Sequence, residues 1–265
     1  MSRLALVLLL LALPAAADET AMVSLQTADD SRGWDAVGKL ILGSNGFCTG
    51  ALIEPQLVLT AAHCLYNKTT GVQIRPEDIQ FFAGWRNGRA MAYRSVSRAV
   101  THPDYRYGAS DKLDRVTADL ALLELSQPIR LPSLVPFGLG PTPVEGDVVS
   151  VVSYAQDRAE APSIQEACDV LAGRTETLVL SCDVDFGSSG APVFSVADGV
   201  ARVVSVISAK AEVDGRKVAL AVPLAAALQD LRDAMAVGRP GARGEPGNVS
   251  ILSGGQGGGA KFIQP

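Results

Sequence analysis

Histidine and positive charge are both scarce in this chain. Its 265 residues include only two histidines, and 28 acidic residues outnumber 23 lysines and arginines. The H-E-x-x-H pattern of zinc peptidases is absent, and no close carboxylate spacing supports a two-histidine metal centre, so we expect neither a metal nor another cofactor. The negative balance also argues against nucleic acid as a partner, because phosphate binding requires a basic surface.

Long apolar runs are missing except at the N-terminus. There Arg3 precedes a ten-residue apolar run, residues 4–13, and three alanines follow at 15–17. This pattern is typical of a secretory signal peptide, with a buried helix as the alternative. Removing residues 1–17 leaves 22 basic and 28 acidic residues, a net charge of about −6. We therefore expect an exported protein, periplasmic or extracellular, without a membrane anchor.

Cysteine is sparse as well, with four in the chain. Four cysteines in an exported protein suggest two disulfides, and three pairings are possible. Local spacing favours the pairs Cys48–Cys64 and Cys168–Cys182. A structural zinc site is the competing interpretation, but its cysteine pairs are normally two to four residues apart.

Three short motifs carry the chemistry that the chain does contain. Residues 186–194, FGSSGAPVF, place Ser189 between glycines, His63 lies in LTAAHC at 59–64, and Asp119 begins the apolar part of ADLALLEL at 118–125. A serine hydroxyl becomes a nucleophile when an imidazole takes its proton and a carboxylate orients that imidazole. Each motif alone is more often a turn or a structural group, so the hypothesis depends on all three together.

The order of the three residues along the chain is His, Asp, Ser. An α/β-hydrolase runs Ser, acid, His and has G-x-S-x-G, where this chain has Ala191 at the last glycine, and subtilisin-like enzymes place the acid before the histidine. The three motifs resemble those of the chymotrypsin/trypsin family of serine endopeptidases, over residues 34–237.

That resemblance implies two six-stranded antiparallel β-barrels with the active site in the cleft between them, and a C-terminal α-helix. It implies His63 as general base, Asp119 as orienting acid and Ser189 as nucleophile, with the backbone N–H groups of Gly187 and Ser189 forming the oxyanion hole. It also matches Cys48–Cys64 to the family's histidine-loop disulfide.

The chain departs from trypsin in two places. Ser188 stands where trypsin has the aspartate that pairs with a newly freed N-terminal amine, and no I-V-G-G sequence is present. Bacterial trypsin-like and glutamyl endopeptidases also lack that aspartate. We therefore expect a bacterial exported enzyme whose oxyanion loop is held by some other contact.

The residues expected to choose the substrate give conflicting indications. Asp183 lies six residues before Ser189, the offset of trypsin's acidic pocket floor, and this narrowly favours cleavage after Arg or Lys. An exposed turn residue is an equally good interpretation of Asp183. Ser208 is expected to line the pocket. Lys210 stands where the family usually has glycine. The alternatives for it are to narrow the pocket, to neutralise Asp183, to favour acidic side chains as in glutamyl endopeptidases, or simply to point to solvent.

Short apolar runs between turn residues predict an all-β sandwich or barrel. The expected strands are 36–42, 47–53, 57–60, 120–125, 148–154, 177–182, 192–196, 200–208 and 217–223, with a hairpin turn at 197–199. Leucines and a methionine at helical spacing predict a helix over 224–237. The expected organisation is a signal peptide at 1–17, an N-terminal extension at 18–32, barrels at 33–128 and 147–237, a linker at 129–146, and a Gly/Pro-rich disordered tail at 238–265.

The leading hypothesis is a monomeric exported serine endopeptidase that acts on proteins or peptides. The first alternative is a secreted binding protein on the same fold whose catalytic power is weakened, suggested by Ser188 and Lys210. A lipase-like esterase shares the acyl-transfer chemistry, but the motif order disfavours it.

Overall fold

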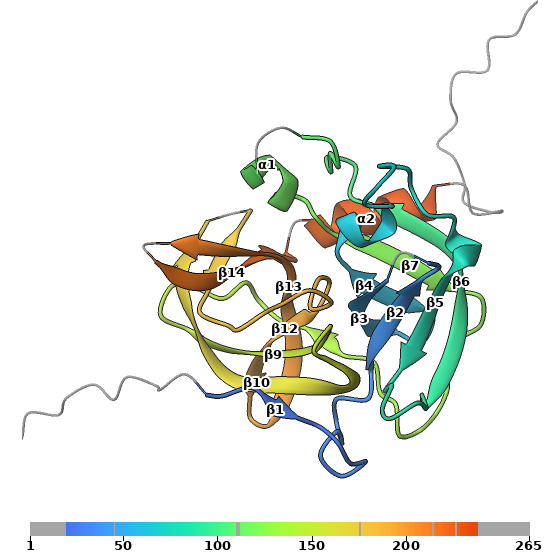
Figure 1. The fold of residues 1–265 in the computed structure, drawn as a ribbon, viewed down its shortest axis with the longest axis horizontal. Helices are drawn as coiled ribbons and strands as arrows, with labels where there is room; N and C mark the ends of the chain where they lie inside the picture. The colour runs from blue at the N-terminus through green and yellow to red at the C-terminus, as the bar shows by residue number, and fades with distance from the viewer. Residues whose placement is uncertain are drawn as a thin grey trace, which may run out of the picture.

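The computed structural model describes residues 20–237 except Asn45, Ser110, Asp111, Thr175, Asp214 and Ala226. Two β-barrels lie side by side in Figure 1, the first in blue to green and the second in yellow to orange. The predicted signal peptide and Gly/Pro-rich tail lie outside the described residues.

The first barrel is a closed ring of six strands in the order β2-β3-β4-β7-β6-β5, with antiparallel pairing throughout. Its β2, β3, β4 and β7 are mainly apolar and almost entirely buried, which suits strands covered on both faces. The strands are β2 Val37–Leu42, β3 Phe47–Glu54, β4 Leu57–Thr60, β5 Ile79–Ala83, β6 Ala92–Thr101 and β7 Ala121–Leu125. The short helices η1 Ala62–Leu65, η2 Pro76–Asp78 and α1 Lys112–Val116 lie in its connections.

The second barrel closes through the strands β9, β10, β11, β14, β13 and β12, all antiparallel, with β12 paired back to β9. Two short strands extend this sheet: β1 pairs with β10, and β8 runs parallel to β13. The strands are β1 Val23–Ser24, β8 Gly138–Leu139, β9 Val148–Ala155, β10 Arg158–Gly173, β11 Leu178–Leu180, β12 Pro192–Ala197, β13 Val200–Val213 and β14 Arg216–Pro223.

The predicted fold class, two six-stranded barrels with a C-terminal helix, is confirmed. All nine predicted strands overlap observed ones, and a hairpin turns at Asp198 and Gly199, both with positive φ. Five strands of the described residues have no predicted counterpart: β1, β5, β6, β8 and β10. The longest of these, β10, includes Pro162 and several charged residues, so its apolar pattern is broken although its backbone pairs on both sides.

The segment between the barrels carries contacts to both. Phe137 donates its N–H to Leu52 of β3, and β8 then joins β13 of the second barrel. The Phe137 ring lies 4.7 Å from that of Phe194, which also contacts Trp34 at 5.0 Å. This aromatic cluster packs the two barrels against each other.

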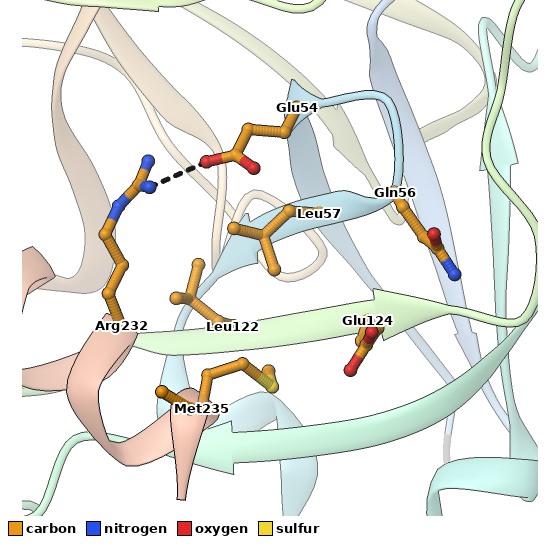
Figure 2. A pocket seen from close by; sticks show the side chains of 8 residues that line it. Glu54, Gln56, Leu57, Leu122, Glu124, Arg232 and Met235 are labelled. Atoms are coloured by element: carbon orange, nitrogen blue, oxygen red, sulfur yellow. Dashed lines mark ion pairs between the residues drawn. The ribbon is translucent and has the colours of Figure 1, made fainter. Parts of the chain in front are cut away.

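The C-terminal helix α2 spans Ala227–Ala236, three residues shorter at its start than predicted. It follows the second barrel in sequence but packs on the first, as Figure 1 shows. Figure 2 shows this contact: Met235 faces Leu57 and Leu122, and Arg232 pairs with Glu54 at 2.7 Å. Arg98 of β6 donates to the carbonyls of Met235 and Val237, which fixes the end of the helix.

Disulfides join Cys48 to Cys64 and Cys168 to Cys182, the two pairs that spacing favoured. Within the described part of the chain, no helix is both long and apolar enough to cross a bilayer.

Candidate active site

His63 and Asp119 are brought together by the pairing of two first-barrel strands. Thr60 at the end of β4 lies opposite Ala121 at the start of β7. The residues that follow β4 and those that precede β7 therefore meet at the same edge of the barrel. His63 lies there in η1, and the disulfide from Cys64 to Cys48 ties this turn to β3.

The two side chains are joined directly. The Nδ1 atom of His63 lies 2.7 Å from Oδ2 of Asp119, and the His63 backbone N–H donates to Oδ1 at 2.8 Å. The Asp119 side chain is only 1% exposed, whereas that of His63 is 22% exposed. A buried carboxylate bound twice to one histidine fixes the orientation of its ring.

A third donor reaches the same carboxylate from the second barrel. The hydroxyl of Ser208, on β13, donates to Oδ2 of Asp119 at 2.5 Å. Ser208, which we expected to line the substrate pocket, lines a cavity together with His63 and Ser189, and its hydroxyl also holds Asp119. The sequence carried no signal for this contact because the two residues are 89 positions apart.

Ser189 faces His63 across a cavity of about 270 Å³ between the barrels. Both residues line it together with Ser208 and Lys210. Among the described residues no direct hydrogen bond joins the Ser189 hydroxyl to His63, and this bond is commonly long in such sites without substrate. The predicted His63 and Ser189 therefore meet at one cavity from the two halves of the chain, and the buried Asp119 is bonded to His63 without lining the cavity itself.

We term residues 186–191, around Ser189, the nucleophile loop. Most of its backbone N–H groups donate hydrogen bonds. The N–H groups of Ser188, Gly190 and Ala191 donate to backbone carbonyls, and that of Phe186 donates to Asp185. Within the described part of the chain, only the N–H groups of Gly187 and Ser189 in this loop have no acceptor. These are the two donors expected to form the oxyanion hole.

Gly187 adopts a φ of +99°, where side chains are disfavoured. A Cβ atom built there would lie 2.4 Å from the Phe47 ring of the first barrel. Both conformation and space therefore require glycine at this position.

Ser188, at the position of trypsin's aspartate, is completely buried. Its hydroxyl lies 3.2 Å from that of Ser153 and 3.4 Å from the carbonyl of Tyr154. Uncharged contacts thus surround the side chain where trypsin has an ion pair.

Of the two charged residues predicted to choose the substrate, the structure places Lys210 at the cavity of Ser189 and Asp183 outside its lining. Asp183 is exposed, and its N–H donates to Gln165 Oε1 at 2.7 Å. It lines a neighbouring hollow that shares Asp185 and Lys210 with the cavity of Ser189, and it does not line that cavity itself. Lys210 does line that cavity and pairs with Asp185 at 2.7 Å. This hydrogen bond lowers the pKa of the Asp185 carboxyl.

Six residues that we did not single out also line the cavity, among them Lys68 and Phe186. The ammonium groups of Lys68 and Lys210 lie 5.8 and 4.2 Å from the centre of the exposed Phe186 ring. Within the described part of the chain, Lys68 has no carboxylate partner. Phe186 belongs to the motif FGSSGAPVF at 186–194. No sequence motif indicated Lys68, because it lies on the first barrel, far along the chain from that motif.

The model of the family described as "Trypsin-like peptidase domain" matches residues 48–206, more than half of the chain. The chain belongs to this trypsin-like peptidase family. The matched segment begins at the first cysteine of the histidine loop and runs past Ser189, so it includes all three proposed catalytic residues of this trypsin-like domain.

Relatives of this trypsin-like domain include peptidases from bacteria and mammals. A glutamyl endopeptidase of Bacillus licheniformis is 29% identical over 163 residues, which cover 58% of this chain and 47% of the relative. A tryptase of Mus musculus is 38% identical over 95 residues, 34% of this chain and 29% of that protein. The chain thus spans less than half the length of these curated relatives.

A solved structure shares the fold of this trypsin-like domain. The structure of a Glu endopeptidase in complex with MPD superposes with a TM-score of 0.67 at 16% identity, covering 82% of this chain and 97% of that one. At this identity the similarity supports the two-barrel architecture alone.

One group in this trypsin-like domain has the composition of a metal site. The ligand atoms of Cys48, His63 and Cys64 lie within 4.8 Å of one another. Both sulfurs are bonded to each other in the disulfide, so they do not provide the thiolates that zinc requires.

Proposed function

We propose that the chain is an exported serine endopeptidase that hydrolyses peptide bonds through an acyl-enzyme. The observation that carries this proposal is the convergence of His63, paired with buried Asp119, and Ser189 at one cavity. The nucleophile loop adds two N–H groups without acceptors beside the serine. A nucleophile, a base, an orienting acid and anion-stabilising donors together form a machinery for acyl transfer.

In the first half-reaction the Ser189 hydroxyl oxygen attacks the peptide carbonyl carbon and its proton passes to Nε2 of His63. The carbonyl π-bond opens, and the negative charge on its oxygen is stabilised by the N–H groups of Gly187 and Ser189. The C–N bond then breaks as His63 donates the proton to the leaving amine, and an acyl ester remains on Ser189. Asp119 stabilises the imidazolium throughout.

In the second half-reaction water attacks the ester and gives a proton to His63. The second tetrahedral intermediate collapses, the C–O bond to Ser189 breaks, and His63 returns the proton to the serine oxygen. The products are a carboxylic acid and the free enzyme, so the cycle needs no cofactor.

We propose that the cavity favours an acidic substrate side chain near the cleaved bond. Lys68 and Lys210 both line it, whereas Asp183, the residue that narrowly favoured a basic substrate, lies outside it. Asp185 neutralises Lys210 in part, and Lys68 supplies a second positive charge from the first barrel. The relative named glutamyl endopeptidase is consistent with this choice.

Export remains part of the proposal and depends on the N-terminal sequence pattern. Two disulfides fit an oxidising compartment, either periplasm or extracellular medium. We propose a monomer with protein or peptide substrates, divided as in the sequence analysis into an extension at 18–32, barrels at 33–128 and 147–237, and a linker at 129–146.

A binding protein with weakened catalysis is the second candidate, favoured by Ser188 and by the Lys210–Asp185 pair at the cavity. A mixed peptide library separates the two candidates. We expect purified protein to cleave peptides, mainly beside acidic residues, and Ser189→Ala to cleave none. Absence of cleavage by the unaltered protein, or equal cleavage by the variant, would contradict the endopeptidase proposal.

A further inference from the structure

Thr49 links the first barrel to the nucleophile loop. It lies in β3, is completely buried, and has all its polar groups bonded. Its backbone N–H donates to the Ser189 carbonyl at 2.9 Å, and its hydroxyl donates to the Gly187 carbonyl at 2.8 Å. The same hydroxyl accepts the N–H of Tyr154, in β9, at 3.1 Å.

The planarity of the peptide bond explains why these contacts matter for the oxyanion hole. The N–H of Gly187 lies in one plane with the Phe186 carbonyl, and the N–H of Ser189 lies in one plane with the Ser188 carbonyl. These two carbonyls accept hydrogen bonds from Gln156 at 2.7 Å and Ala191 at 2.9 Å. The direction of each free N–H therefore depends on the bond to the carbonyl of the residue before it and on how the neighbouring peptide planes are held.

Thr49 holds the two other peptide planes of this segment, which alternate along the chain with the two that contain the free N–H groups. The Gly187 carbonyl fixes the plane between residues 187 and 188, and the Ser189 carbonyl fixes the plane between 189 and 190. Four consecutive peptide planes are thus anchored, two of them by Thr49. A rotation at residue 187, which its glycine permits, would break the hydroxyl bond of Thr49.

We propose that Thr49 is a positioning residue whose hydroxyl keeps the Gly187 N–H aimed at the oxyanion. This inference rests on the proposed function and extends it to the first barrel. The hydroxyl supplies part of the support that trypsin obtains from its ion pair, because Ser188 at that position makes only uncharged contacts. Thr49 touches neither substrate nor the reacting atoms, so its effect passes through the loop.

The test compares Thr49→Val with Thr49→Ser. Valine keeps the volume and the backbone N–H but removes both hydroxyl bonds, whereas serine keeps the hydroxyl. We expect valine to lower kcat about 10- to 100-fold while KM changes less than about twofold, and serine to retain kcat within about threefold. Affinity for a peptide trifluoromethyl ketone, which forms an oxyanion at Ser189, should fall by the same factor as kcat.

Ser150→Ala is the matched control. Its buried hydroxyl donates to the Glu166 carbonyl at 2.7 Å within the second barrel, away from the loop. We expect it to lower the melting temperature as a lost buried hydrogen bond should, with unchanged kcat and ketone affinity. If Thr49→Val fails to fold, Thr49→Ala removes the same hydroxyl with a smaller side chain and is measured by the same assays.

A folded Thr49→Val or Thr49→Ala with native kcat and native ketone affinity would overturn the assignment. So would a Ser150→Ala variant that loses kcat to the same extent, because the effect would then be general destabilisation. Turnover that survives in Ser189→Ala would overturn the proposed function instead, so the two failures are distinguishable.

Discussion

The two barrels contribute to the candidate site in different ways. The first supplies His63 and Asp119, joined side chain to side chain at 2.7 Å. The second supplies the nucleophile loop, whose backbone groups bond to one another, to neighbouring residues of the second barrel and to Thr49 of the first. One half of the site therefore depends on a buried charge, and the other depends on the directions of a few peptide planes.

Each half is also held by a residue of the other. Ser208 of the second barrel donates to Asp119, and Thr49 of the first barrel donates to the carbonyl of Gly187. Both are small buried hydroxyl residues that reach across the junction. The site is thus a property of the barrels' relative placement, which the aromatic contacts of Phe194 help to fix.

Removing the reacting group of either half should have the largest effect. We expect Ser189→Ala and His63→Ala each to reduce kcat by about 10⁴- to 10⁶-fold, with little further loss in the double variant, because the residues act as a unit. Steady-state hydrolysis of a cleaved library peptide measures this. Losses that multiply in the double variant would show that the two halves act separately.

Asp119→Asn changes the charged half alone. The carboxylate accepts two bonds from His63 and one from Ser208, and an amide replaces one of its acceptor oxygens with a donor. We expect about a 10⁴-fold loss of kcat with the fold retained. A kcat within tenfold of native, measured with the same peptide, would contradict the role of Asp119.

Gly187→Ala changes the backbone half alone. Alanine would be strained at a φ of +99°, and its methyl group would lie against Phe47, so the loop must shift. We expect kcat to fall about 10²- to 10³-fold, as when an oxyanion donor is lost.

Gly33→Ala is its control, because Gly33 also has a positive φ, +88°, but a Cβ there meets nothing within 4 Å. Both variants should lose stability through backbone strain, and only the first should lose kcat. Equal kcat values for the two would contradict the oxyanion-hole assignment.

Substrate selection should draw on both barrels. We expect Lys68→Ala and Lys210→Ala each to reduce kcat/KM for acidic peptides by about 5- to 20-fold and to change cleavage of neutral peptides much less. Peptide pairs that differ only in a Glu or Gln beside the cleaved bond measure this. Equal losses of kcat/KM for the Glu and Gln peptides would show that the two lysines do not choose the substrate side chain.

The smallest effect concerns pH. The hydrogen bond from Lys210 lowers the pKa of Asp185 below its usual value of 3.8, so the pair is intact above that value and is lost as pH falls through the lowered pKa. Lys210→Ala should raise the pKa of Asp185, measured by NMR titration of its carboxyl carbon. Both side chains are about half exposed, so melting temperatures at neutral pH should hardly change.

The sequence indicated the proposed catalytic residues more directly than the residues that support them. His63, Asp119 and Ser189 lie in local motifs, and the apolar runs predicted the buried strands around them. Thr49, Lys68 and the Asp119 contact of Ser208 depend on distances across the barrel junction, which no local pattern encodes. The strand β10 was missed for a related reason: its pairing comes from its neighbours rather than from its own alternation.

Covalent labelling with a fluorophosphonate tests the central claim most directly. The account predicts one adduct, mapped by mass spectrometry to Ser189, and its loss in His63→Ala, because the serine needs its base to react. An adduct at another residue, or undiminished labelling of Ser189 in His63→Ala, would contradict the proposal that these barrels assemble a working triad.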